Sequence, residues 1–81
     1  MTNRDKLRQL ILDVFLLDPS EFRFDLRRTE VDTWDSFGLV SLAVGVQETF
    51  GYHFKPEEAT GLQGVADIIR VLGARGVSFD D

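Results

Sequence analysis

Ser36 is the residue of this chain whose type and position most clearly suit chemistry. It stands in the run Trp34-Asp35-Ser36-Phe37-Gly38, at the head of an apolar stretch that ends at Phe50. A hydroxyl at the start of a helix lies beside backbone N–H groups without intrahelical partners and at the positive end of the helix dipole. A phosphate attached to that oxygen would be stabilised. The sequence therefore predicts that Ser36 is a covalent attachment point.

Other reactive groups are scarce. The chain has no cysteine, which removes disulfides, thiolate metal ligands and cysteine nucleophiles together. His53 is the only histidine and lies between aromatic residues, with no second histidine or nucleophile near it in the sequence. A hydrolase needs a serine with a general base and an oxyanion site, and a metal enzyme needs three convergent ligands. We therefore predict neither an enzyme nor a metal site.

Length and charge narrow the class of protein further. The 81 residues predict one domain, 1–81, with a modest core. Nine basic against fourteen acidic residues give a formal charge of −5, which disfavours nucleic acid and favours basic protein partners. Charged residues interrupt the first fifteen positions, so neither a signal peptide nor a membrane span is expected. We expect a cytoplasmic monomer that binds no membrane.

The apolar spacing predicts an all-α fold. A helix over about 3–17 follows from apolar residues at three- and four-residue steps: Leu7, Leu10, Ile11, Val14 and Leu17. Residues 18–33 have no sustained period, and a lone strand there would have no partner. We predict a long ordered loop that is fixed to the core by four apolar side chains: Phe22, Phe24, Leu26 and Val31.

Three more helices complete the predicted bundle. The second spans about 36–50, with Asp35 as its N-cap and Gly51 after its end. A short third helix over 56–60 begins at Pro56, with two carboxylates in its first turn. The fourth spans about 64–74, and 77–81 are expected to fray. The architecture is thus three main helices, one short helix and a long loop between the first two.

The second helix is apolar on two faces. At about 100° per residue, one arc holds an ordinary core stripe: Leu39, Leu42, Ala43, Val46 and Phe50. Phe37, Val40 and Val44 project from the opposite side, which three other short helices cannot easily cover. Their exposure would predict a docking surface. The alternative is that the long loop folds over this side and buries it.

At this point the chain resembles the acyl carrier protein family, phosphopantetheine-binding four-helix domains of fatty acid, polyketide and nonribosomal peptide synthesis. Asp35-Ser36-Phe37 is similar to the family's Asp-Ser-Leu tripeptide, and Trp34 precedes it as in many discrete, stand-alone carriers. The likeness spans nearly the whole chain. The resemblance also rests on three other segments: Glu48-Thr49-Phe50-Gly51, Phe54-Lys55-Pro56-Glu57-Glu58 and Val65-Ala66-Asp67-Ile68-Ile69.

The resemblance implies a role for each matching residue. Ser36 would be esterified with 4′-phosphopantetheine, which a phosphopantetheinyl transferase takes from coenzyme A. The thiol of this arm would carry a thioester between a loading ligase and synthase enzymes, so the protein itself would not catalyse. Asp35 would help present the hydroxyl to the transferase. Three further residues match positions where the family contacts partner enzymes, in addition to Phe37: Val40, Val44 and Glu48.

Departures from the pattern leave alternatives open. Phe37 with Gly38 is also similar to the Asp-Ser-Phe-Gly of D-alanyl carriers, so an aminoacyl or peptidyl cargo remains an alternative. Glu48 is the only acid within the second helix, which favours a specialised pathway over housekeeping fatty acid synthesis. A different class is a non-covalent helical adaptor, which would bind a partner helix through its exposed apolar face and would not depend on Ser36.

Overall fold

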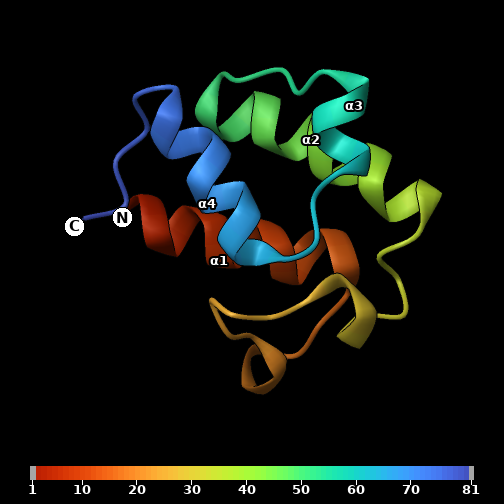
Figure 1. Cartoon of the computed structure of the whole chain (residues 1–81). Coiled ribbons are helices and arrows are strands. Elements are labelled where there is room, and N and C mark those ends of the chain that lie inside the picture. Colours follow the sequence, from red (N-terminus) through yellow and green to blue (C-terminus); the bar gives the residue numbers. More distant parts are fainter. Residues whose placement is uncertain (1, 81) are drawn as a thin grey trace.

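A computed structural model describes residues 2–80, and these form a helical bundle (Figure 1). The helices are α1 (Asn3–Phe15), α2 (Ser36–Phe50), α3 (Pro56–Thr60) and α4 (Val65–Ala74), with two 3₁₀ turns, η1 (Pro19–Glu21) and η2 (Arg28–Glu30), between α1 and α2. Helices α1 and α2 run in opposite directions, and α4 crosses α1. The all-α architecture predicted from the spacing is confirmed, with the short third helix where proline places it.

Helix α1 ends two residues earlier than its apolar spacing predicts. Thr2 and Asp5 form a capping box at its start, in which the Asp5 N–H donates to the Thr2 hydroxyl at 3.1 Å. At its other end Leu16 adopts a left-handed conformation with φ 57°, and the Leu17 N–H donates to the Leu12 carbonyl. Leu17 still packs against the core, so the apolar period continues beyond the last helical turn.

The loop between α1 and α2 is ordered, as expected, and it has a partner. Leu26 and Val31 are buried, and Phe22 and Phe24 pack against the core. The Val65 N–H donates to the Leu26 carbonyl at 2.9 Å, so an extended piece of the loop pairs with the entry to α4 as a single β-bridge. Gly64 belongs to this pairing and caps α4, which therefore begins at residue 65 rather than 64.

One core holds the bundle together. Side chains from every long helix meet in it with almost no exposure: Leu7, Ile11, Phe15, Leu42, Val46, Val65, Ile68 and Leu72. Leu42 and Val46 form the centre of the predicted α2 stripe, and Leu39, Ala43 and Phe50 pack at its edge. None of the helices within 2–80 is long and apolar enough to cross a membrane.

The C-terminal segment is fastened rather than frayed as far as residue 80. Phe79 is only 6% exposed and packs on Phe50, with ring centroids 5.8 Å apart. Its carbonyl accepts a 2.7 Å hydrogen bond from Arg4, and the Ser78 carbonyl accepts one from Asn3. The prediction that 77–81 would fray is therefore wrong for 77–80, and residue 81 lies outside the described residues. The glycines after the fourth helix suggested a flexible tail, and nothing local to the sequence showed that the ring of Phe79 is buried.

Truncation of this anchor should loosen the whole bundle. We expect Phe79→Ala to lower the free energy of unfolding by about 2–4 kcal/mol, because a buried ring is lost and a cavity is left. Urea denaturation followed by the fluorescence of Trp34 measures the change. Asp80→Ala, at an exposed neighbour, is the control and should stay within about 0.5 kcal/mol of the parent. Equal stability of the two variants would contradict the anchor.

Candidate functional site

The site is built where the end of α1 meets the start of α2. The rings of Phe15 and Trp34 stack with centroids 4.7 Å apart and planes 16° from parallel. The Thr33 hydroxyl donates a 2.8 Å hydrogen bond to the Phe15 carbonyl, one of the carbonyls that a helix end leaves unpaired. Trp34 is 6% exposed, so it packs in the core rather than serving as a surface anchor. These contacts fix the entry of the chain into α2.

Ser36 is the first residue of α2, and its side chain is exposed. Asp35 caps the helix, as predicted, because its carboxylate accepts a 3.0 Å hydrogen bond from the Gly38 N–H. By helix geometry the N–H groups of Ser36 and Phe37 have no acceptor within the helix. The hydroxyl therefore lies outside the core, beside unpaired donors and the positive end of a 15-residue dipole. This is a favourable environment for a phosphodiester on that oxygen.

Gly38 allows this close junction to form. A β-carbon at residue 38 would collide with the Thr33 carbonyl oxygen and come within 2.9 Å of the Phe15 ring. Gly38 lowers the helix propensity of α2, but glycine is required here because the preceding loop approaches the helix so closely. Gly45 faces α1 differently, because a β-carbon there would meet only the flexible end of Leu10 and, farther off, Val14.

The second apolar face of α2 is exposed, and the long loop does not bury it. We name Phe37, Val40 and Val44 the α2 apolar stripe; their exposed fractions are 87%, 64% and 50%. Isolated exposed apolar residues need no explanation, but three consecutive positions of one helical face form a patch. The arrangement is open to a partner and begins one residue after Ser36.

The stripe borders a groove between α2 and α3. This α2–α3 groove has a volume of about 360 Å³, and its lining is mostly apolar: Leu39, Val40, Ala43, Val44, Gln47, His53, Phe54, Pro56, Ala59 and Thr60. It begins about one helical turn beyond Ser36, roughly 5 Å along the axis. Ala43 and Ala59 leave room in it because their side chains are short. An extended chain attached to Ser36 could lie along this groove.

A polar pair marks the distal end of the groove. His53 Nδ1 lies 2.9 Å from Gln47 Oε1, so the imidazole can donate to the amide oxygen. His53 is exposed, and this contact gives it a structural partner rather than a catalytic one. Within residues 2–80 no group of three or more histidine or carboxylate side chains is placed to hold a metal ion.

The α3 wall of the groove is tied to the rest of the bundle through Glu58. Its carboxylate accepts hydrogen bonds from the Tyr52 hydroxyl at 2.5 Å and from the Lys55 N–H at 3.0 Å, and it lies 3.7 Å from the Arg75 guanidinium. The Tyr52 bond, followed by the Lys55 N–H, holds the pKa of Glu58 below its ordinary value. The same bond raises the pKa of Tyr52. These contacts tie the five-residue helix α3 to the segment before it and to the end of α4.

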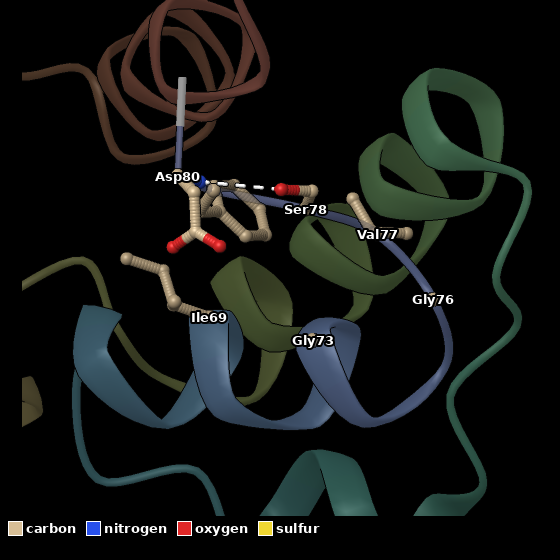
Figure 2. Close-up of a pocket in the computed structure, with 7 residues that line it drawn as sticks. Ile69, Gly73, Gly76, Val77, Ser78 and Asp80 are labelled. Atoms are coloured by element: carbon tan, nitrogen blue, oxygen red, sulfur yellow. Dashed lines mark hydrogen bonds between the residues drawn. The ribbon is translucent and has the colours of Figure 1, made fainter.

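Glu48 lies apart from the α2–α3 groove. It is exposed and borders a shallow depression shared with Lys6 and Gln9 of α1. A further depression, of about 330 Å³, lies under the C-terminal segment, where the Asp80 carboxylate points toward Ile69 and the Asp80 N–H donates to the Ser78 hydroxyl (Figure 2). It is far from the serine, since the adjoining Phe79 packs on the last residue of α2, about 21 Å of helix from its start.

The structure thus gathers most of the predicted site at one end of the molecule. Asp35, Ser36 and the α2 apolar stripe lie on consecutive turns, whereas Glu48 lies toward α1. The sequence did not reveal the groove, because its α3 wall depends on how the 51–55 segment folds back. The small residues Ala43 and Ala59 were the available signal.

Comparisons with known proteins bear on the family of this chain. No family model matches the chain. Among curated proteins it is similar to "Acyl carrier protein 2" of Ralstonia nicotianae, with 31% identity over 65 residues that cover 80% of each of the two chains. Identity of this extent over most of both chains establishes common family membership.

The junction beneath Ser36 predicts an unequal cost for two glycine substitutions. Gly38→Ala should lower the free energy of unfolding by about 2 kcal/mol, because the backbone of the preceding loop must move. Gly45→Ala should change it by less than about 1 kcal/mol, since the end of Leu10 can shift and the helix gains propensity. Urea denaturation measures both. A cost at residue 45 equal to that at residue 38 would contradict the close approach.

The Tyr52–Glu58 bond predicts a pH dependence on the acid side. A carboxylate with a lowered folded pKa stabilises the fold above its unfolded pKa, and that contribution disappears as pH falls through the folded pKa. Tyr52→Phe should raise the Glu58 pKa toward its ordinary value and weaken the acid dependence of stability below about pH 4.5. An NMR titration of the Glu58 carboxyl carbon reads the pKa directly. Arg23→Gln, which perturbs Glu30 instead, should leave that titration unchanged.

Proposed function

The chain belongs to the acyl carrier protein family, and we propose that Ser36 bears the prosthetic group of this carrier. Members of this family are carriers rather than enzymes, and their cofactor is covalently attached 4′-phosphopantetheine. The observation that carries the proposal is the exposed hydroxyl of Ser36 at the N-terminus of α2, beside a cap that Asp35 supplies. Because the chain has no cysteine, the thiol of the arm would be its means of forming a thioester.

The attachment reaction is a balanced transfer from coenzyme A. The Ser36 oxygen forms a bond to the phosphorus that bears pantetheine, the bond from that phosphorus to adenosine 3′,5′-bisphosphate breaks, and the hydroxyl proton passes to a base of the transferase. The chain contributes orientation, through the Asp35 cap, and a favourable field at the product phosphodiester. The transferase supplies the catalytic groups.

We propose that the arm and a short acyl cargo bind in the α2–α3 groove. It starts one turn from Ser36 and offers an apolar surface with small side chains at Ala43 and Ala59. The bulky rings of Phe15 and Phe54 fill the nearby interior, which favours a short acyl chain over a long one. We propose that the α2 apolar stripe and Asp35 bind the partner enzymes, with Glu48 at the edge of that surface.

We further propose that the carrier serves a specialised polyketide or related acyl pathway, as a cytoplasmic monomer that receives its cargo from a separate ligase or synthase. The near absence of acids from α2 supports this over housekeeping fatty acid synthesis. An aminoacyl cargo is the second candidate, and the Phe37-Gly38 pair favours it. Mass spectrometry of the carrier purified from its native cell distinguishes acyl from aminoacyl thioesters.

Modification tests the attachment residue directly. Incubation with coenzyme A and a promiscuous phosphopantetheinyl transferase should add the mass of one arm to the parent protein, and Ser36→Ala should abolish the gain. Ser41→Ala removes another exposed serine of α2 and should be modified like the parent. Intact-mass spectrometry reads all three. Absence of any gain in the parent would leave the non-covalent adaptor, and a gain in Ser36→Ala would place the arm elsewhere.

A further inference from the structure

The α2–α3 groove is apolar along most of its α2 wall and polar at one end. The residues of α2 that line it are apolar as far as Val44, and the next one is Gln47. His53 lies beside Gln47, with its Nδ1 2.9 Å from the amide oxygen. The amide nitrogen of Gln47 carries two N–H groups and has no hydrogen-bond partner within residues 2–80. This end of the groove therefore offers donors that the fold itself does not use.

Gln47 lies in line with Ser36 along α2. The step from residue 36 to residue 47 is about three turns, or about 16 Å of helix. At about 100° per residue the two positions differ by only about 20° around the axis, and Val40 and Ala43 lie on the same face between them. Val40 and Ala43 also line the groove. A straight path along α2 from the Ser36 hydroxyl thus ends at Gln47.

The arm proposed for Ser36 matches this path in length. Three bonds of extended backbone span about 3.3–3.6 Å, so the chain of about fourteen bonds from the serine oxygen to the sulfur of 4′-phosphopantetheine reaches about 16 Å. Along the groove its methyl groups would cover apolar side chains. Val40 and Val44 at the edge are exposed, so the amides of the arm remain in contact with water. The extended arm places its sulfur beside Gln47.

We propose that Gln47, oriented by His53, donates a hydrogen bond to the carbonyl oxygen of the thioester cargo at this end of the groove. This inference rests on the proposed function of Ser36. A thioester carbonyl accepts hydrogen bonds and donates none, which matches an amide N–H group. The contact with His53 occupies the amide oxygen and leaves the nitrogen for the cargo. Gln47 thus contacts the ligand, and His53 is a positioning residue.

A carbonyl-labelled thioester tests the contact. Butanoyl coenzyme A with ¹³C at the carbonyl and the promiscuous transferase load the parent protein in one step. We expect its ¹³C resonance downfield of that of free butanoyl-pantetheine, because the oxygen accepts a hydrogen bond. We also expect a nuclear Overhauser effect between the Gln47 amide protons and the methylene next to sulfur. Gln47→Leu should return the resonance to the free position, whereas Gln9→Leu, at an exposed glutamine of α1, should leave it unchanged.

Substitutions of His53 test the positioning role. His53→Leu should lose most of the downfield shift, because the Gln47 amide is no longer held. His53→Gln keeps an N–H donor and should retain the shift. Both residues are exposed, so native amide spectra are expected for every variant. Equal shifts in the two variants would refute the positioning role.

The outcomes separate this inference from the proposal on which it rests. A parent protein that carries the arm but shows the free resonance position refutes the contact, while Ser36 stands. A downfield shift that persists in Gln47→Leu does the same. If the parent protein gains no arm, the proposed function fails, and the cargo contact fails with it.

Discussion

The face-to-face stack of Phe15 on Trp34 is the interaction on which the site depends. It closes α1 against the chain just before α2, and the Thr33 hydrogen bond to the Phe15 carbonyl completes the closure. Because Trp34 is buried, Asp35 takes the N-cap position and Ser36 lies in the first, exposed turn of α2. A buried ring two positions earlier thus determines that the Ser36 hydroxyl faces solvent, and Gly38 makes room for the arrangement.

Local departures from folding preference gather at this end of the molecule. Gly38 weakens its helix, Phe37 exposes a ring, and Leu16 holds a conformation better suited to glycine. Such departures are expected where function competes with stability. At the opposite end no such departure occurs: Phe79 is buried, and the carbonyls of Ser78 and Phe79 accept hydrogen bonds from Asn3 and Arg4. This contrast agrees with the proposal that the end of the bundle with Ser36 is the functional one.

Local signals in the sequence predicted most of the fold. The bounds of α2 and α3 followed from Asp35, Gly51 and Pro56, because caps and breakers act within a few residues. The exposed stripe followed from helical geometry. Features that depend on distant segments could not be read: the pairing of Leu26 with Val65, the burial of Phe79, and the α3 wall of the groove. The early end of α1 was missed because apolar spacing continues through a left-handed residue that nothing local to the sequence identifies.

The hydrogen bonds from Asn3 and Arg4 to residues 78 and 79 have a consequence for assembly. They place the two ends of the described chain side by side, at the pole where α1 begins, whereas Ser36 lies at the pole where α1 finishes (Figure 1). A tether joined to either end would leave from the pole remote from the serine. Such a tether would therefore leave the surface around Ser36 uncovered.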